Sequence, residues 1–435
     1  MTIKFCVALA VLVILPTIAS AQGNPGPYGG LFGRAPATKD TVTSAVDVRS
    51  SIGGNYDTAL LPPETVPDLA TQSGAGVGAT AGLSFRHASP GLNASLDGTA
   101  GRTSYITEPS YSANYFAAGA VISSALTARV RGDAALSYTH SPFFQFYQNL
   151  GGSGFVDTNA AAVAMPPFAP YAAEMLENEA VQAAVGVETK LTDRSDFTVS
   201  AHRSHTSFSR SNADLVSTGV NGRWNWELWK GFGVHAGYGQ DRWNQAGEQS
   251  REFVHEIIDV GVDFNRALSL SRKTTLSFRT SSSIFKSSSE NESHVRINGG
   301  VEFAKFFRRT WQIVAEARRE TTFVPGFFEP LYADSVGLSL SGMFTKRVDW
   351  HVVASAGRAE GAFSETSGFN TASAWSRLNI ALSKHLGLFG QYGAYRYQLP
   401  PNSNSLGLSE RLARQTVSIG LNAYIPVYNK TRVAK

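Results

Sequence analysis

Cysteine is almost absent from this sequence. The single cysteine, Cys6, lies in an apolar run near the start of the chain, between Lys4 and residues 19 to 21, which read Ala-Ser-Ala. A positive residue, an apolar core and an A-x-A pattern are typical of a secretory signal peptide, so we expect residues 1 to 21 to be removed. A membrane anchor would need ~20 apolar residues, and this run is shorter. The remaining chain would then have no thiol, which excludes disulfides and cysteine-ligated metals.

The sequence also lacks a concentration of charge and, beyond residue 21, a long hydrophobic run. Its 38 basic and 34 acidic residues are spread along the chain and give a net charge of +4. A nucleic-acid-binding protein would need a concentrated basic face, so this class is not supported. Hydrophobic residues make up 43% of the chain, yet the mean hydropathy is only −0.12. A transmembrane β-barrel accounts for both the high hydrophobic content and the near-neutral mean hydropathy, because its strands alternate lipid-facing apolar and lumen-facing polar residues.

Alternation with a period of two is clearest in residues 295 to 324. Val295, Ile297 and Val301 fall on one side of this stretch, while polar residues fall on the other. The pattern pauses at residues 307 to 310 and then resumes, which predicts a β-hairpin with a short basic turn. Similar basic turns recur along the chain and predict an up-and-down meander; they lie near Arg129, Arg194, Lys230, Lys273, Arg309, Arg347 and Lys384.

We predict an all-β, antiparallel transmembrane barrel of eighteen strands over residues 41 to 428, with sixteen strands as the fallback. The Gly- and Pro-rich residues 22 to 40 are expected to form a flexible periplasmic lead-in, and residues 429 to 435 a basic tail. An even strand count places both termini on one side, and short turns face the periplasm in this class. The predicted strands are 41–56, 75–86, 92–105, 111–125, 127–139, 177–191, 195–209, 213–228, 231–243, 252–268, 273–287, 292–306, 310–324, 332–345, 348–362, 369–383, 385–399 and 411–425.

This pattern resembles the outer-membrane β-barrel proteins of Gram-negative bacteria, and more specifically the porins. The resemblance covers residues 41 to 428 in architecture and not in a diagnostic motif. It implies insertion by the outer-membrane assembly machinery and contact with outer-membrane lipid and lipopolysaccharide. It also implies a homotrimer, which is the common assembly of porins, although no residue of this sequence identifies an interface strand.

In porins the third external loop folds into the lumen and narrows the pore, and residues 141 to 173 take that place here. This loop departs from the porin pattern because it has a single acid and many aromatic residues. The chain also departs at its end, where basic residues follow Tyr428 in place of a terminal aromatic residue. The constriction-loop candidates are Phe143, Phe144, Phe146, Tyr147 and Asp157.

The strand phase assigns a nearly equal mixture of basic and acidic residues to the lumen, which predicts weak ion selectivity. Each of these residues has two interpretations, a cross-strand ion pair that stiffens the wall or a contact with solute, and the first is the commoner. The pore-lining candidates are Arg129, Arg131, Asp133, Asn221, Arg223, Asn225, Glu227, His235, Asp241, Arg279, Arg296, Glu316, Arg318 and Glu320.

Enzymatic barrels need a nucleophile and a base within hydrogen-bond reach. Ser204 and His202 share a face, but that face is assigned to the lumen, and His205 points to the opposite side, which excludes a metal shared by the two histidines. We therefore expect no catalytic residue, metal or cofactor.

The expected function is passive diffusion of small hydrophilic solutes through an outer-membrane channel. The alternative is a structural or polysaccharide-secretion-accessory barrel with a blocked lumen. It is suggested by the sequence of residues 50 to 60, SSIGGNYDTAL, which is similar in general character to that of exopolysaccharide-associated barrels.

Overall fold

The computed structural model describes residues 31, 41–58, 73–106, 112–141, 177–208, 211–245, 251–267, 274–287, 293–308, 310–324, 327, 329–363, 367–400 and 410–433. Within these ranges the chain forms eighteen β-strands. They are β1 (Thr41–Asp57), β2 (Gly74–Ala88), β3 (Leu92–Tyr105), β4 (Ser112–Ala125), β5 (Val130–Ser141), β6 (Asn178–Thr192), β7 (Ser195–Phe208), β8 (Ser211–Trp229), β9 (Phe232–Gln245), β10 (Arg251–Ala267), β11 (Thr274–Ser287), β12 (Ser293–Phe307), β13 (Trp311–Thr322), β14 (Leu331–Thr345), β15 (Val348–Gly361), β16 (Gly368–Ala381), β17 (Leu386–Gln398) and β18 (Arg411–Val433).

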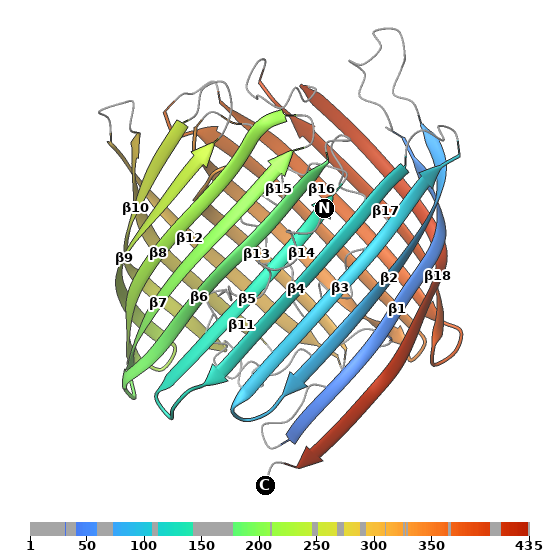
Figure 1. Cartoon of the computed structure of the whole chain (residues 1–435), viewed down its shortest axis with the longest axis horizontal. Coiled ribbons are helices and arrows are strands. Elements are labelled where there is room, and N and C mark those ends of the chain that lie inside the picture. The colour runs from blue at the N-terminus through green and yellow to red at the C-terminus, as the bar shows by residue number, and fades with distance from the viewer. Residues whose placement is uncertain are drawn as a thin grey trace, which may run out of the picture.

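The strands form one closed barrel. Each pairs antiparallel with its neighbours in sequence, and β1 pairs with both β2 and β18, so the wall has no free edge. Figure 1 shows the tilted strands around this wall, with the short turns and the C-terminal end of β18 at the lower end. We call this the short-turn end and the opposite one the long-loop end. The predicted fold class and the count of eighteen strands are confirmed.

Within the described ranges no helix is long and apolar enough to cross a membrane.

The turns near Arg129, Arg194 and Arg347 share a hydroxyl side chain as well as a basic residue. The hydroxyl oxygen of Thr127 accepts a hydrogen bond from the backbone N–H of Arg129 at 3.2 Å, and Thr192 and Thr345 do the same for the residue two positions on. A Ser or Thr that bonds the backbone in this way competes with the strand ladder and favours a turn. The strand predicted from residue 127 therefore begins at Val130, because Thr127 belongs to the turn.

The last strand is longer than the predicted 411–425. β18 continues to Val433, and residues 429 to 433, which we expected to form a basic tail, pair with residues 41 to 45 of β1. The register shifts between Val46 and Asp47, whose partners are Tyr428 and Pro426, so Val427 is the extra residue of a bulge. Proline lacks a backbone donor and is tolerated in strands at such bulges. The first residues of β1 thereby gain a partner that the shorter strand would have left out.

Two features close the seam between β1 and β18. Gly53 and Gly420 face each other across it, and a Cβ on Gly420 would lie 2.2 Å from the carbonyl oxygen of Ile52, so only glycine allows this approach. Nearer the long-loop end, the Arg414 guanidinium donates to both carboxylate oxygens of Asp57, with Nε–O distances of 2.9 and 2.8 Å. Both side chains are buried, so the pair joins the two ends of the chain inside the barrel.

Candidate functional site: the barrel lumen

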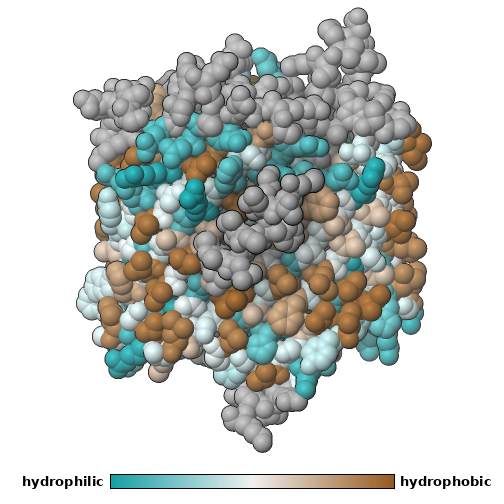
Figure 2. Space-filling model, in the orientation of Figure 1, coloured by the Kyte–Doolittle hydropathy of each residue, from teal (hydrophilic) through white to brown (hydrophobic). Residues whose placement is uncertain are grey.

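The two faces of the wall differ in the way that the alternation predicts. The exposed outward residues include Ile52, Leu83, Leu96, Val220, Val260, Ile297, Val336 and Ile419. Figure 2 shows apolar side chains over the middle and lower part of the outer wall and polar side chains above them. Aromatic residues gather on this face at the short-turn end, where Trp229 stacks on Phe232 at 4.4 Å and Trp311 contacts Phe344 at 5.0 Å, an arrangement typical of an interfacial girdle.

The lumen-facing side is polar and wide. Eighteen strands spaced about 4.8 Å apart and tilted by about 40° close a ring of roughly 35 Å backbone diameter. Barrels of this strand number leave an aqueous channel unless chain segments fill them. The contents of the lumen therefore decide what can pass.

A charged cluster lies on the lumen wall of β8 to β10. The Arg223 guanidinium contacts Asp259 at 3.3 Å and also bonds Asp263. The His235 ring lies between the same two carboxylates, with its Nε2 3.1 Å from Asp259 and its Nδ1 2.9 Å from Asp263. Arg223 Nε also donates to Asn225 at 2.6 Å. The structure thus brings together three of the pore-lining candidates with two neighbouring aspartates.

A second group on the same wall joins β7, β9 and β10. Asp241 lies between two histidines, 3.7 Å from His202 Nε2 and 3.6 Å from His255 Nδ1. The His255 ring also stacks on Trp243 at 5.2 Å. Within the described residues no group of three or more His, Cys, Asp or Glu side chains is arranged to hold a metal ion.

The remaining candidates occupy different places on the wall. Arg131 bonds Asp133 at 3.2 Å on β5, and Arg318 bonds Glu316 at 2.9 Å on β13. Glu227 accepts the backbone N–H of Gly231 at 3.0 Å, so its carboxylate supports a turn. Arg129 is in the turn before β5. In the strand registers Arg279 lies opposite Asp263, Asn221 opposite Gly239 and Glu320 opposite Ala333. The Arg296 guanidinium lies over the Tyr332 ring, 4.4 Å from its centroid.

An apolar cluster inside the long-loop end was not predicted. It joins lumen-facing residues of β14 to β18 with Val324 and Phe327, which follow β13, and with Phe208 of β7. Val324 and Phe327 are fully buried at 0% exposure. Because β8 to β13 separate β7 from β14 in the wall, this cluster brings together parts of the barrel that are far apart in the sheet. The cluster consists of Phe208, Val324, Phe327, Leu331, Ala333, Ala359, Phe369, Tyr395, Tyr397, Leu399 and Leu412.

The segment between β13 and β14 also contacts the opposite half of the wall. Phe323 packs with Leu215, Trp243 and Phe253 of β8 to β10, with ring centroids 5.7 Å from Trp243. Glu329 accepts the backbone N–H of Phe363 at 2.6 Å, which ties this segment to the next loop. The side chains of Phe323, Val324 and Phe327 therefore narrow the lumen, and no pattern in the sequence signalled this role. The constriction-loop candidates Phe143, Phe144, Phe146, Tyr147 and Asp157 lie outside the described residues.

The lumen is packed on one side and open on the other. Lumen-facing side chains of β16 and β17 are buried although they point into the barrel, and they include Thr371, Ser373, Trp375, Arg377, Asn379, Phe389, Gln391 and Tyr395. The lumen-facing Arg131, His202 and Arg279 of β5, β7 and β11 are exposed, whereas His235, His255 and Asp259 of β9 and β10 are buried. An aqueous path therefore has room beside β5, β7 and β11.

One contact on the packed side involves the segment before β1. Asp349, which is 2% exposed, accepts the backbone N–H of Leu31 at 3.0 Å through one oxygen and the amide of Asn379 at 2.7 Å through the other. Arg377 donates to the same Asn379 at 3.0 Å. Leu31, in the lead-in expected to be periplasmic, thus lies against the lumen wall near the short-turn end, 318 residues from its partner in sequence.

A closed wall with an apolar outer band and a polar, partly open lumen is the arrangement of a barrel that spans a membrane. Within its described residues the chain is a closed, antiparallel β-barrel of eighteen strands. Solved structures with the same architecture include OpdL of Pseudomonas aeruginosa (9% identity, 88% of this chain and 99% of that chain, TM-score 0.41). They also include P. aeruginosa OccK2 (OpdF) in complex with glucuronate (6%, 88% and 98%, TM-score 0.42) and the P. aeruginosa siderophore receptor PirA (10%, 90% and 82%, TM-score 0.39).

No family model and no curated protein sequence matches this chain. At identities of 6 to 10% and TM-scores of 0.39 to 0.42, these similarities say nothing about a shared cargo.

Proposed function

We propose that the barrel is a passive channel for small hydrophilic solutes in the outer membrane. The observation that carries this proposal is the exposure of the lumen-facing Arg131, His202 and Arg279 on β5, β7 and β11. The packed side of the lumen and the side chains of Phe323, Val324 and Phe327 leave a path much narrower than the backbone ring. Exclusion of large solutes follows from that narrowing, and polar wall groups can replace part of a solute's hydration.

Weak ion selectivity is part of the proposal. Most charged groups on the open side are already paired across or along strands, as in Arg223 with Asp259 and Arg131 with Asp133. Paired charges of opposite sign create little net field at the distance of a passing ion. The pore is therefore proposed to discriminate by size and polarity more than by charge.

Orientation and processing complete the proposal. Short turns face the periplasm in barrels of this class, so the short-turn end, with the C-terminal end of β18, is placed there. The signal peptide is proposed to be cleaved after Ala21, and the outer-membrane assembly machinery to insert the barrel. None of the charged clusters is assigned a catalytic role.

Single-channel recording from the purified protein in a planar bilayer, with the reversal potential under a salt gradient, tests this function. We expect stable open steps, a reversal potential near zero and a reduction of current by small hydrophilic solutes. A protein that circular dichroism shows to be folded and β-rich, but that never conducts, would overturn the channel and leave the blocked-lumen barrel in its place.

A further inference from the structure

The wall of the barrel has a fork where β12 and β13 separate. Their pairing runs from Phe307 and Trp311 at the short-turn end and stops at Gly299 and Arg319. Beyond that pair, within the described residues, β12 continues to pair only with β11, and β13 only with β14. An unpaired strand edge is costly in a membrane wall because its backbone donors and acceptors lose their partners. Other contacts must therefore hold the two strands apart.

The contacts across the fork show how these strand ends are displaced. By strand alternation, Arg296 and Asn298 belong to the lumen-facing side of β12, whereas Thr321 of β13 and Tyr332 of β14 belong to the outward side. The Thr321 hydroxyl donates to Asn298 Oδ1 at 3.3 Å, and the Arg296 guanidinium lies over the Tyr332 ring, 4.4 Å from its centroid. The inward side of one strand meets the outward side of its neighbours only where the neighbours lie inside it. The long-loop ends of β13 and β14 therefore lean into the lumen.

Apolar packing holds the two ends in this position. Phe323, which follows β13, lies among the lumen-facing Leu215, Trp243 and Phe253 of β8 to β10, with ring centroids 5.7 Å from Trp243 and 5.5 Å from Phe253. Tyr332 packs against the same cluster. Burial of these rings compensates for the strand pairs that are missing at the fork. It also places two aromatic side chains in the lumen.

The sequence also has the pattern for a second arrangement, in which the pairing of β12 and β13 continues. Two residues beyond the last pair, the same register places Ile297 opposite Thr321, and two residues further it places Val295 opposite Phe323. Ile297 and Val295 are outward residues, 73% and 65% exposed, so Phe323 would lie beside Val295 on the lipid-facing side. An aromatic residue opposite a β-branched one is a favourable cross-strand pair. The alternation that predicts a strand over 310–324 includes these positions.

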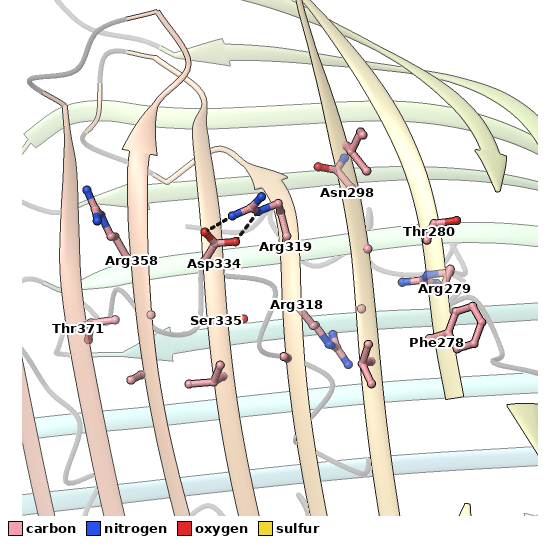
Figure 3. A pocket seen from close by; sticks show the side chains of 18 of the residues that line it. Phe278, Arg279, Thr280, Asn298, Arg318, Arg319, Asp334, Ser335, Arg358 and Thr371 are labelled. Carbon is pink, nitrogen blue, oxygen red and sulfur yellow. Dashed lines mark hydrogen bonds and ion pairs between the residues drawn. The ribbon is translucent and has the colours of Figure 1, made fainter. Parts of the chain in front are cut away.

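The outer wall has room for this movement. A hollow of about 1010 Å³ lies at the fork, lined by Ile297 and Asn298 of β12 and by Arg319 of β13. Figure 3 shows the hollow from close by, with Arg319 joined to Asp334 of β14 through two hydrogen bonds of 2.6 and 2.7 Å. These bonds and the ladder between β13 and β14 connect the two strand ends, so we expect them to move as one unit.

We propose that the long-loop ends of β13 and β14 form a gate with two states. In the forked state of this structure, Phe323 and Tyr332 occupy the lumen. In the zipped state, residues 295–298 pair with residues 320–323, and both rings turn to the outer face of the wall. Apolar packing stabilises the forked state and backbone hydrogen bonds stabilise the zipped one, so each state satisfies groups that the other leaves without partners. The proposal rests on the proposed channel, which conducts better in the zipped state because its lumen is wider.

Paired cysteines test the gate. Cys6 is the only cysteine of the sequence and lies in the expected signal peptide, so an introduced pair would have no competing thiol. Two fork pairs become opposite residues only in the zipped state, and two control pairs are already opposite in the closed part of the same ladder. Opposite residues alternate between hydrogen-bonded and non-hydrogen-bonded sites, so each outward or inward fork pair has a control of its own kind. The outward fork pair is I297C/T321C with control V301C/A317C, and the inward fork pair is N298C/E320C with control E302C/E316C.

The purified barrel is oxidised, cross-linking is read as a mobility shift on a gel, and single-channel conductance is recorded before and after addition of a reductant. We expect at least one fork pair to cross-link and to raise the conductance, and the reductant to reverse the rise. The control pairs should cross-link without a change in conductance. Tyr332→Ala removes contacts that only the forked state makes, so it should speed cross-linking of the fork pairs.

Two results would overturn the gate. If a control pair cross-links and its matched fork pair does not, the barrel does not reach the zipped state. If a fork pair cross-links in a conducting barrel and the conductance stays the same, the strand ends do not control the lumen. Because the gel reads zipping without a current, a silent barrel whose fork pairs cross-link would refute only the proposed transport function.

Discussion

Removing one partner of the Arg414–Asp57 pair should destabilise the barrel far more than removing one partner of a solvated pair. The side chains are 4% and 1% exposed and join β18 to β1, 357 residues apart. Tyr105 of β3 also bonds Arg414. We predict that Arg414→Met or Asp57→Ala lowers the free energy of unfolding by about 3–5 kcal/mol, because the surviving charge stays buried without its partner.

The double variant separates the pair from its surroundings. Removing both charges leaves no buried ion, so the loss of the double variant should be smaller than either single loss and far below their sum. The control is a second Arg–Asp pair, Arg131–Asp133 on β5. Its atoms lie 3.2 Å apart, and its arginine side chain is 44% exposed. Solvated pairs of this kind contribute about 0–1 kcal/mol, so Arg131→Met should cost little.

Urea titration of the barrel in lipid vesicles, followed by tryptophan fluorescence and by the gel shift of the folded form, measures these values. Coupling between Asp57 and Arg414 of at least about 2 kcal/mol is expected from the double-mutant cycle. Additive single effects, or an equal cost for Arg131→Met, would refute the reasoning that burial at the seam makes this ion pair important.

Three further predictions concern the seam and the lumen. Phe327→Ala should lower the free energy of unfolding by about 3–5 kcal/mol in urea titration and raise the single-channel conductance, because Phe327 is fully buried in the lumen cluster. Tyr56→Ala on the outer wall is the control, and an unchanged conductance in Phe327→Ala would contradict the constriction. Gly420→Ala should cost about 1–3 kcal/mol in the same titration, since its Cβ would meet the Ile52 carbonyl at 2.2 Å, and wild-type stability would show that the seam can relax. Asp349→Asn leaves one acceptor oxygen for the two donors, the Leu31 backbone N–H and the Asn379 amide, so the Leu31 contact should weaken. In a Leu31→Cys background, the thiol should then react faster with a water-soluble reagent when Asp349→Asn is present than when it is absent. An equal rate would contradict the Leu31 contact.

Alternation along the chain was sufficient to predict the wall. A strand presents its residues to two faces in turn, and the lipid requires apolar residues on one of them, so the pattern of Val295, Ile297 and Val301 is visible without tertiary information. The turns were visible for a similar local reason, although their basic residues drew attention first and the hydroxyl of Thr127 or Thr192 makes the actual bond. Most strand boundaries agreed with the structure to within a few residues for these reasons.

The sequence alone did not indicate what fills the lumen. Phe327 and Val324 look like ordinary loop residues, and their burial depends on β14 to β18 and β7 being brought to opposite sides of one closed wall. The aromatic residues at 143 to 147 were a stronger local signal for a constriction, and they lie outside the described residues. Likewise nothing in the sequence singled out Asp349, which the fold places against Leu31.

The sequence by itself determined the wall, because strand alternation and turn chemistry depend on residues that are close along the chain. Only the tertiary structure decided the seam, the packed side of the lumen and the outer hollow. Each of these depends on which distant residues face each other once β1 has paired with β18, as Arg414 does with Asp57, and closure of the barrel sets those positions. A residue's phase on its strand tells which face it occupies, but not what lies opposite it.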